Sequence, residues 1–142
     1  MNKIILPLGI VAVSLVVIFG LIIYEHYTAP YQQEFKIEKD GSHYVVKIFS
    51  KYKFSIENFA FNEENMISFD LSSQRDGEIT IEFSNELLQK DSMSGEIINP
   101  IVLSNGEEIK VSKKSQQEKI QIQFYYDNKP RTIEIILSFY SI

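Results

Sequence analysis

Cysteine and tryptophan are both absent from this chain of 142 residues. Without cysteine there is no disulfide, no thiolate metal ligand, no thiol nucleophile and no cysteine-linked lipid. Any folded domain in the chain therefore depends on an apolar core for its stability. The cysteine pair and the buried tryptophan of an antibody-type immunoglobulin domain are excluded as well.

The short motifs of common active sites are also missing. The sequence has no Gly-rich phosphate loop, no His-Glu-x-x-His, no Gly-x-Ser-x-Gly and no calcium loop of alternating aspartates. The two histidines, His26 and His43, lie apart, and neither has a partner at the spacing of metal ligands. We therefore predict no catalytic, cofactor-binding or metal-binding residues and do not expect an enzyme, and the sequence identifies no small-molecule ligand.

The sequence shows no basic stretch. The formal net charge is -5 at pH 7, the pI is about 5.1, and acidic residues are mixed with lysines. Proteins that bind nucleic acid present clustered lysines and arginines to the phosphates. Nucleic acid is therefore not an expected partner.

One long apolar run is present, over residues 4–24. As a helix, it is long enough to cross the roughly 30 Å hydrocarbon core of a bilayer. Lys3 precedes the run and Glu25 follows it, and positive flanks tend to stay in the cytoplasm. We therefore predict a single-pass anchor in the cell membrane, with the C-terminal domain outside the cytoplasm. A cleaved signal peptide is the alternative, although its apolar core is usually only about 7–15 residues long.

Tyrosines are frequent where the apolar run ends, at Tyr24, Tyr27 and Tyr31. Amphipathic rings favour the headgroup layer of a membrane, so we predict that these three residues are membrane-interface anchors. The resulting division of the chain is a membrane anchor at residues 1–24, a juxtamembrane linker at residues 25–32 and an extracytoplasmic domain at residues 33–142.

Beyond the linker, apolar and polar residues alternate in short segments separated by turn residues, which is typical of half-buried strands. Turns are predicted at Asp40–Gly41 and Asn105–Gly106, a capped helical turn or an irregular crossover at residues 84–88, and a mobile hydrophilic linker at residues 112–118. About seven to nine strands with one apolar face each favour an all-β fold. We predict an antiparallel β-sandwich, immunoglobulin-like in general architecture, behind the single transmembrane helix.

The last two segments, residues 119–126 and 131–139, are predicted to pair as a hairpin around residues 127–130. In this register, the inner pairs are all apolar: Phe124 with Ile133, Ile122 with Ile135, and Ile120 with Leu137. The same register brings five residues together on the outer face, which we predict as a candidate interaction face: Gln121, Gln123, Tyr125, Thr132 and Glu134. An ordinary solvated face is the alternative.

Several short motifs between residues 52 and 138 form a recognisable series. A run at residues 59–71 is followed by Asp76–Gly77, by an Ile-Thr-Ile strand at residues 79–81 and by a leucine pair at residues 87–88. Residues 101–106 are similar to a Val-x-x-Asp-Gly hairpin, and residues 120–137 to a closing pair of strands. This series resembles a β-sandwich module of archaeal surface and secreted proteins, although Ser84 stands near the place of that module's proline. The resemblance implies a surface β-sandwich without an established enzymatic role, and it supplies no site residues.

Two functions remain open at this point. The first is a membrane-tethered interaction module that docks to another envelope protein or to a surface polymer. The second is an accessory or sensory subunit of a larger membrane complex, held through its transmembrane helix. A tether tolerates replacement of its anchor by an unrelated helix, whereas a subunit held through helix packing does not.

Overall fold

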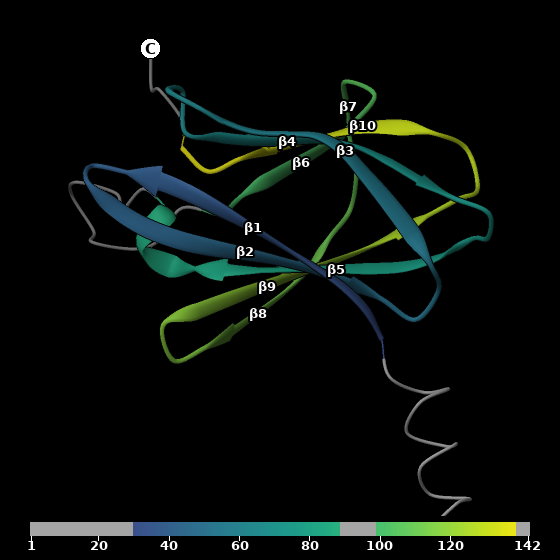
Figure 1. The fold of residues 1–142 in the computed structure, drawn as a ribbon, viewed down its shortest axis with the longest axis horizontal. Helices are drawn as coiled ribbons and strands as arrows, with labels where there is room; N and C mark the ends of the chain where they lie inside the picture. Colours follow the sequence, from purple (N-terminus) through teal and green to yellow (C-terminus); the bar gives the residue numbers. More distant parts are fainter. Residues whose placement is uncertain (1–29, 89–98, 139–142) are drawn as a thin grey trace, which may run out of the picture.

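The computed structural model describes residues 30–88 and 99–138. This part of the chain forms two antiparallel sheets of five strands each (Figure 1). The prediction of an all-β fold is therefore confirmed. The predicted anchor at residues 1–24 lies outside the described residues. Within the described ranges, no helix has the length and apolar character that a membrane span requires.

Consecutive strands mostly join the same sheet in pairs, and the chain then crosses to the other sheet. The first sheet has the order β1-β2-β5-β9-β8 and contains β1 (Tyr31–Lys39), β2 (Ser42–Ser50), β5 (Gly77–Ser84), β9 (Lys119–Tyr126) and β8 (Ser112–Gln116). The second has the order β3-β4-β10-β6-β7 and contains β3 (Phe54–Asn62), β4 (Met66–Ser73), β10 (Arg131–Ile136), β6 (Ile101–Ser104) and β7 (Glu107–Glu108). A short 3-10 turn, η1 (Asn85–Leu87), follows β5.

The turn residues have the conformations that their side chains favour. Asp40 and Gly41 have φ values of 52° and 77°, and Asn105 and Gly106 have φ values of 51° and 83°. Two successive positive φ values make a tight turn whose twist matches that of the flanking strands. Both predicted hairpin turns are therefore confirmed.

The capped helical turn is also present. The Ser84 hydroxyl accepts a hydrogen bond from the Glu86 backbone amide, as expected of an N-cap. Leu87 and Leu88 are buried beneath the turn. Burial of these two side chains holds η1 against the core.

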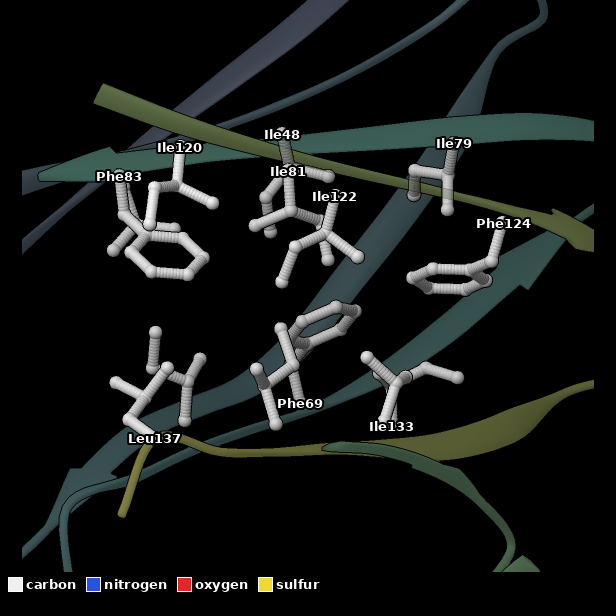
Figure 2. Packing of buried hydrophobic residues seen from close by; sticks show 14 of the residues in the cluster. Ile48, Phe69, Ile79, Ile81, Phe83, Ile120, Ile122, Phe124, Ile133 and Leu137 are labelled. Carbon is white, nitrogen blue, oxygen red and sulfur yellow. The ribbon is translucent and has the colours of Figure 1, made fainter. Parts of the chain in front are cut away.

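The core lies between the sheets. Figure 2 shows isoleucines and phenylalanines of β5 and β9 facing Phe69 of β4 and Ile133 of β10. Ile81, Ile122 and Ile133 have no exposed surface. Full burial of one such side chain contributes about 1.5–3 kcal/mol, so this shared layer is the main source of stability in a chain without disulfides.

The predicted hairpin of residues 119–139 is wrong. β9 pairs with β5, placing Ile122 beside Ile81, whereas β10 pairs with β4 in the other sheet, placing Ile135 beside Ile67. The chain crosses from one sheet to the other at residues 127–130. The apolar residues of both strands still point to one core, but they meet across it instead of side by side. Alternation alone does not distinguish these two arrangements, because both bury the same faces.

Arg131 holds this crossover in place. Its guanidinium forms an ion pair with Asp127, and it donates a hydrogen bond from Nη1 to Ser104 Oγ over 3.1 Å. The Lys129 backbone amide and then Arg131 lower the pKa of Asp127. The Asp127 carboxylate therefore stays ionised in the pair at neutral pH.

The prediction of a mobile linker at residues 112–118 is also wrong. Residues 112–116 form β8, the edge strand beside β9, and all five side chains are exposed. A strand that is solvated on both faces has no apolar alternation, so its sequence reads as a loop. Its two lysines, Lys113 and Lys114, are typical of edge strands that avoid pairing with other chains.

A small polar cluster occupies one end of the core. The Tyr126 side chain is 1% exposed, and its hydroxyl lies 3.0 Å from Ser50 Oγ, which donates in turn to the Glu78 carbonyl oxygen over 2.7 Å. A Cβ atom at Gly77 would lie 3.0 Å from the Tyr126 hydroxyl oxygen. The Asp-Gly pair at the start of β5 therefore serves close packing, because a Cβ atom at position 77 would crowd the tyrosine.

Candidate interaction surfaces

The outer face of β9 carries an ordered row of polar side chains. Gln121 donates a hydrogen bond to the Glu82 carboxylate, and Gln123 donates one to the Glu78 carboxylate, each over 2.8 Å. These are cross-strand contacts between β9 and β5, which lie side by side in the first sheet. Tyr125 follows in the same row, and 64% of its surface is exposed. We call Gln121, Gln123, Tyr125, Glu78 and Glu82 the β9 face.

Neighbouring side chains keep one carboxylate of the β9 face, that of Glu82, ionised. The hydrogen bond from Gln121 is the main cause that lowers the pKa of Glu82, and Lys119, 3.4 Å away, lowers it further. The carboxylate is therefore ionised at neutral pH. The result is a surface of carboxylates and amides held in one arrangement, with an exposed phenol ring beside it.

Thr132 and Glu134 do not belong to this surface. They lie on β10, in the second sheet, so they point outward on the opposite side of the molecule. The prediction that they share one face with Gln121, Gln123 and Tyr125 is therefore wrong, and its physical cause is the crossover at residues 127–130.

Thr132 has a different environment. Its hydroxyl donates to Asp70 Oδ1 over 2.9 Å, and Asn58 donates to Asp70 Oδ2 over 2.8 Å. The bond from Asn58 and then the bond from Thr132 lower the pKa of Asp70. Asn58 has a φ of 54° and lies at a bulge in β3, where the register shifts between Glu57 and Ala60. This second outer face therefore has its own hydrogen-bonded network.

A groove opens at the end of the sandwich where β1 begins. It has a volume of about 630 Å³ and lies between the start of β1 at Tyr31, the β2–β3 loop at residues 51–53 and the β4–β5 loop at residues 74–76. Tyr31, one of the predicted membrane-interface residues, lines this groove and is 52% exposed. The other two, Tyr24 and Tyr27, lie outside the described residues.

Cations surround the groove. The Arg75 guanidinium carbon lies 4.3 Å from the centre of the Tyr52 ring, and Lys51 Nζ lies 5.6 Å from the same centre. These distances are typical of cation–π contacts, which keep the charges on the rim. Lys53 is exposed in the same loop as Lys51. We call Lys51, Lys53 and Arg75 the basic rim.

The basic rim is not evident from the sequence pattern, because its members belong to two loops separated by two strands. A usable signal was present. In an antiparallel fold, the chain reverses at each turn, so the loops after β2 and β4 return to the end where β1 begins. Strand counting would have placed Lys51, Lys53 and Arg75 at the same end of the domain as Tyr31.

The described residues contain no group of His, Asp and Glu side chains arranged to hold a metal ion. Comparison with known proteins adds no assignment: no family model matches the chain, and neither a curated protein nor a solved structure matches it.

Proposed function

We propose that this protein is a membrane-tethered interaction module outside the cytoplasm, which docks to another envelope protein or to a surface polymer. The apolar run at residues 4–24 supplies the tether. The β9 face supplies the docking surface, and the observation that carries the proposal is the exposed Tyr125 ring beside hydrogen-bonded amide–carboxylate pairs.

Two physical properties suit the β9 face to a large partner. Gln121 and Gln123 are already held by Glu82 and Glu78, so binding requires little further loss of side-chain freedom. Tyr125 offers a large, rigid ring with a polar tip, and tyrosine is enriched among residues that dominate binding energies. An open strand face of this kind is suited to another surface more than to an enclosed small molecule.

Replacement of the anchor distinguishes this proposal from the alternative, an accessory subunit held through its transmembrane helix. A chain whose residues 1–24 are replaced by an unrelated single-pass anchor keeps the sandwich at the membrane. We expect its partner recovery to be unchanged. Loss of the partner with a correctly inserted replacement anchor would favour the accessory subunit instead.

Photo-crosslinking on intact cells tests the docking surface. A photoreactive phenylalanine analogue is placed at Tyr125 in one full-length variant and at Glu134, on the opposite outer face, in a matched control. We expect a discrete crosslinked product from position 125 and none from position 134. Adding Gln123→Lys to the first variant should reduce the yield, because the bond to Glu78 is replaced and a charge is introduced. Equal products from both positions would overturn the assignment of the β9 face.

A further inference from the structure

We propose that the end of the sandwich containing Tyr31 and the basic rim docks onto the anionic headgroups of the membrane that holds the anchor. This inference rests on the proposed tether, and it adds a second contact between the domain and the bilayer. Its ligand is the lipid phosphate, met by the ammonium groups of Lys51 and Lys53 and by the guanidinium of Arg75.

The two loops that carry the basic rim hold more cations than carboxylates. Lys51, Lys53 and Arg75 are all exposed, and within residues 30–88 and 99–138 none of them forms an ion pair with a carboxylate. Asp76 is the single carboxylate in the two rim loops, and it accepts a hydrogen bond from the Asn128 backbone amide over 2.8 Å. The rim loops together are therefore positively charged, although the whole chain carries -5.

The opposite end is acidic. The turns there lie after β1, β3 and β8, at the far end of the ribbon from the start of β1 in Figure 1. Four exposed carboxylates lie in these turns: Asp40, Glu63, Glu64 and Glu118. An anionic surface attracts the rim loops and repels these turns, which favours one orientation of the domain.

The aromatic residues at the basic rim also suit the headgroup layer. Tyr31 is 52% exposed at the mouth of the groove, and Tyr52 lies beneath Arg75. Tyrosine rings prefer the interface between hydrocarbon and water, where the ring is partly buried and the hydroxyl stays solvated. The rim therefore combines the two residue classes that hold proteins at anionic membrane surfaces.

The length of the tether keeps this end near the bilayer. Tyr31 follows Tyr24, the last residue of the apolar run, by seven positions, so a fully extended chain separates them by at most about 25 Å. A tether of this length holds the rim at a high effective concentration beside the headgroups. The acidic end lies a further strand length away, about 30 Å for the nine residues of β1.

In this orientation the strands run along the membrane normal. The β9 face then points sideways, parallel to the plane of the membrane. Tyr125 is near the end of β9 that carries the rim, because Tyr125 pairs with Glu78 at the start of β5. A partner anchored in the same membrane could then reach Tyr125 without passing over the acidic end.

The test uses the full-length chain in lipid nanodiscs. Because the protein has no cysteine, Gln74→Cys places one fluorophore beside the basic rim, and Glu64→Cys places one at the acidic end as a control. Quenching by spin-labelled headgroups is compared in phosphatidylcholine alone and in a mixture with phosphatidylglycerol. We expect stronger quenching at position 74 in the anionic discs, reversed by high salt, and little quenching at position 64 in either disc.

Charge removal makes the test specific. Each exposed cation near an anionic surface changes association by about fivefold, so Lys51→Gln, Lys53→Gln and Arg75→Gln together should weaken docking roughly a hundredfold. A control variant removes three exposed cations from β8 and the segment before it, Lys110, Lys113 and Lys114, and should leave the quenching unchanged. Equal quenching at position 74 in both lipids, or equal losses in the two triple variants, would overturn the docking inference alone. Failure of the chain to insert into the discs would overturn the tether and this inference together.

Discussion

Ile122→Lys and Gln123→Lys add the same side chain to opposite faces of β9. Ile122 has no exposed surface and lies between β5 and β8, next to Ile81. Gln123 lies on the outer face and contacts the Glu78 carboxylate. The structure therefore predicts that one substitution disrupts the core, whereas the other replaces a hydrogen bond by an ion pair at the surface.

The size of the Ile122→Lys effect follows from two contributions. Loss of the buried isoleucine costs about 2 kcal/mol of unfolding free energy. The new lysine has no partner in the core, and keeping it neutral at pH 7 costs about 4–5 kcal/mol relative to an ordinary lysine pKa of about 10.4. Since domains of this size have roughly 5–15 kcal/mol of stability, most of it would be lost. Gln123→Lys should change stability by less than about 0.5 kcal/mol.

Thermal unfolding of the fragment of residues 31–142, followed by circular dichroism, measures both effects. We expect a β-rich, soluble fragment, a melting midpoint lowered by about 25 °C or more in Ile122→Lys, and an unchanged midpoint in Gln123→Lys. The Ile122→Lys penalty should shrink by roughly 2.7 kcal/mol between pH 7 and pH 9, because only the unfolded lysine binds a proton in that range. Equal midpoints for the two variants, or a penalty independent of pH, would refute the assignment of Ile122 to the core.

Two further predictions concern the polar networks. Tyr126→Phe removes the hydroxyl next to Ser50 Oγ, and it should cost about 1 kcal/mol in urea unfolding with an unchanged m value, because Ser50 keeps its bond to the Glu78 carbonyl oxygen. Thr132→Val removes one of the two hydrogen bonds that lower the pKa of Asp70, so an NMR titration should show this pKa rising. A lowered pKa of Asp70 stabilises the folded state when the pH is above the ordinary aspartate pKa, and this stabilisation is lost as the pH falls through the pKa of the folded state. The stability of the variant should therefore differ from that of wild type at neutral pH and converge with it in strong acid. An unchanged Asp70 titration would contradict the network.

The sequence predicted the local structure of this chain better than its long-range pairing. Residues such as Asp40–Gly41 and Asn105–Gly106 determine tight turns by their own backbone preferences, and alternation identified which residues of β9 are buried. Neither signal says which sheet a strand joins. The choice between a hairpin and a crossover after Tyr126 depends on contacts with β5 and β4, which are distant in sequence.

The same limit applies to the candidate surfaces. Three of the five residues predicted as an interaction face, Gln121, Gln123 and Tyr125, do lie together on β9, because they share one strand. Thr132 and Glu134 were added through the incorrect hairpin. The basic rim was missed for the converse reason, since loops far apart in sequence meet there only after the strands have been placed.

The side of the membrane on which the domain lies is the most direct test of the account. Ser115 is exposed on the edge strand β8, and the chain has no natural cysteine, so Ser115→Cys gives a single accessible thiol. A membrane-impermeant maleimide added to intact cells should label the full-length variant, because a module that docks to envelope partners lies outside the cytoplasm. Labelling that occurs only after the cells are lysed would contradict the proposed function.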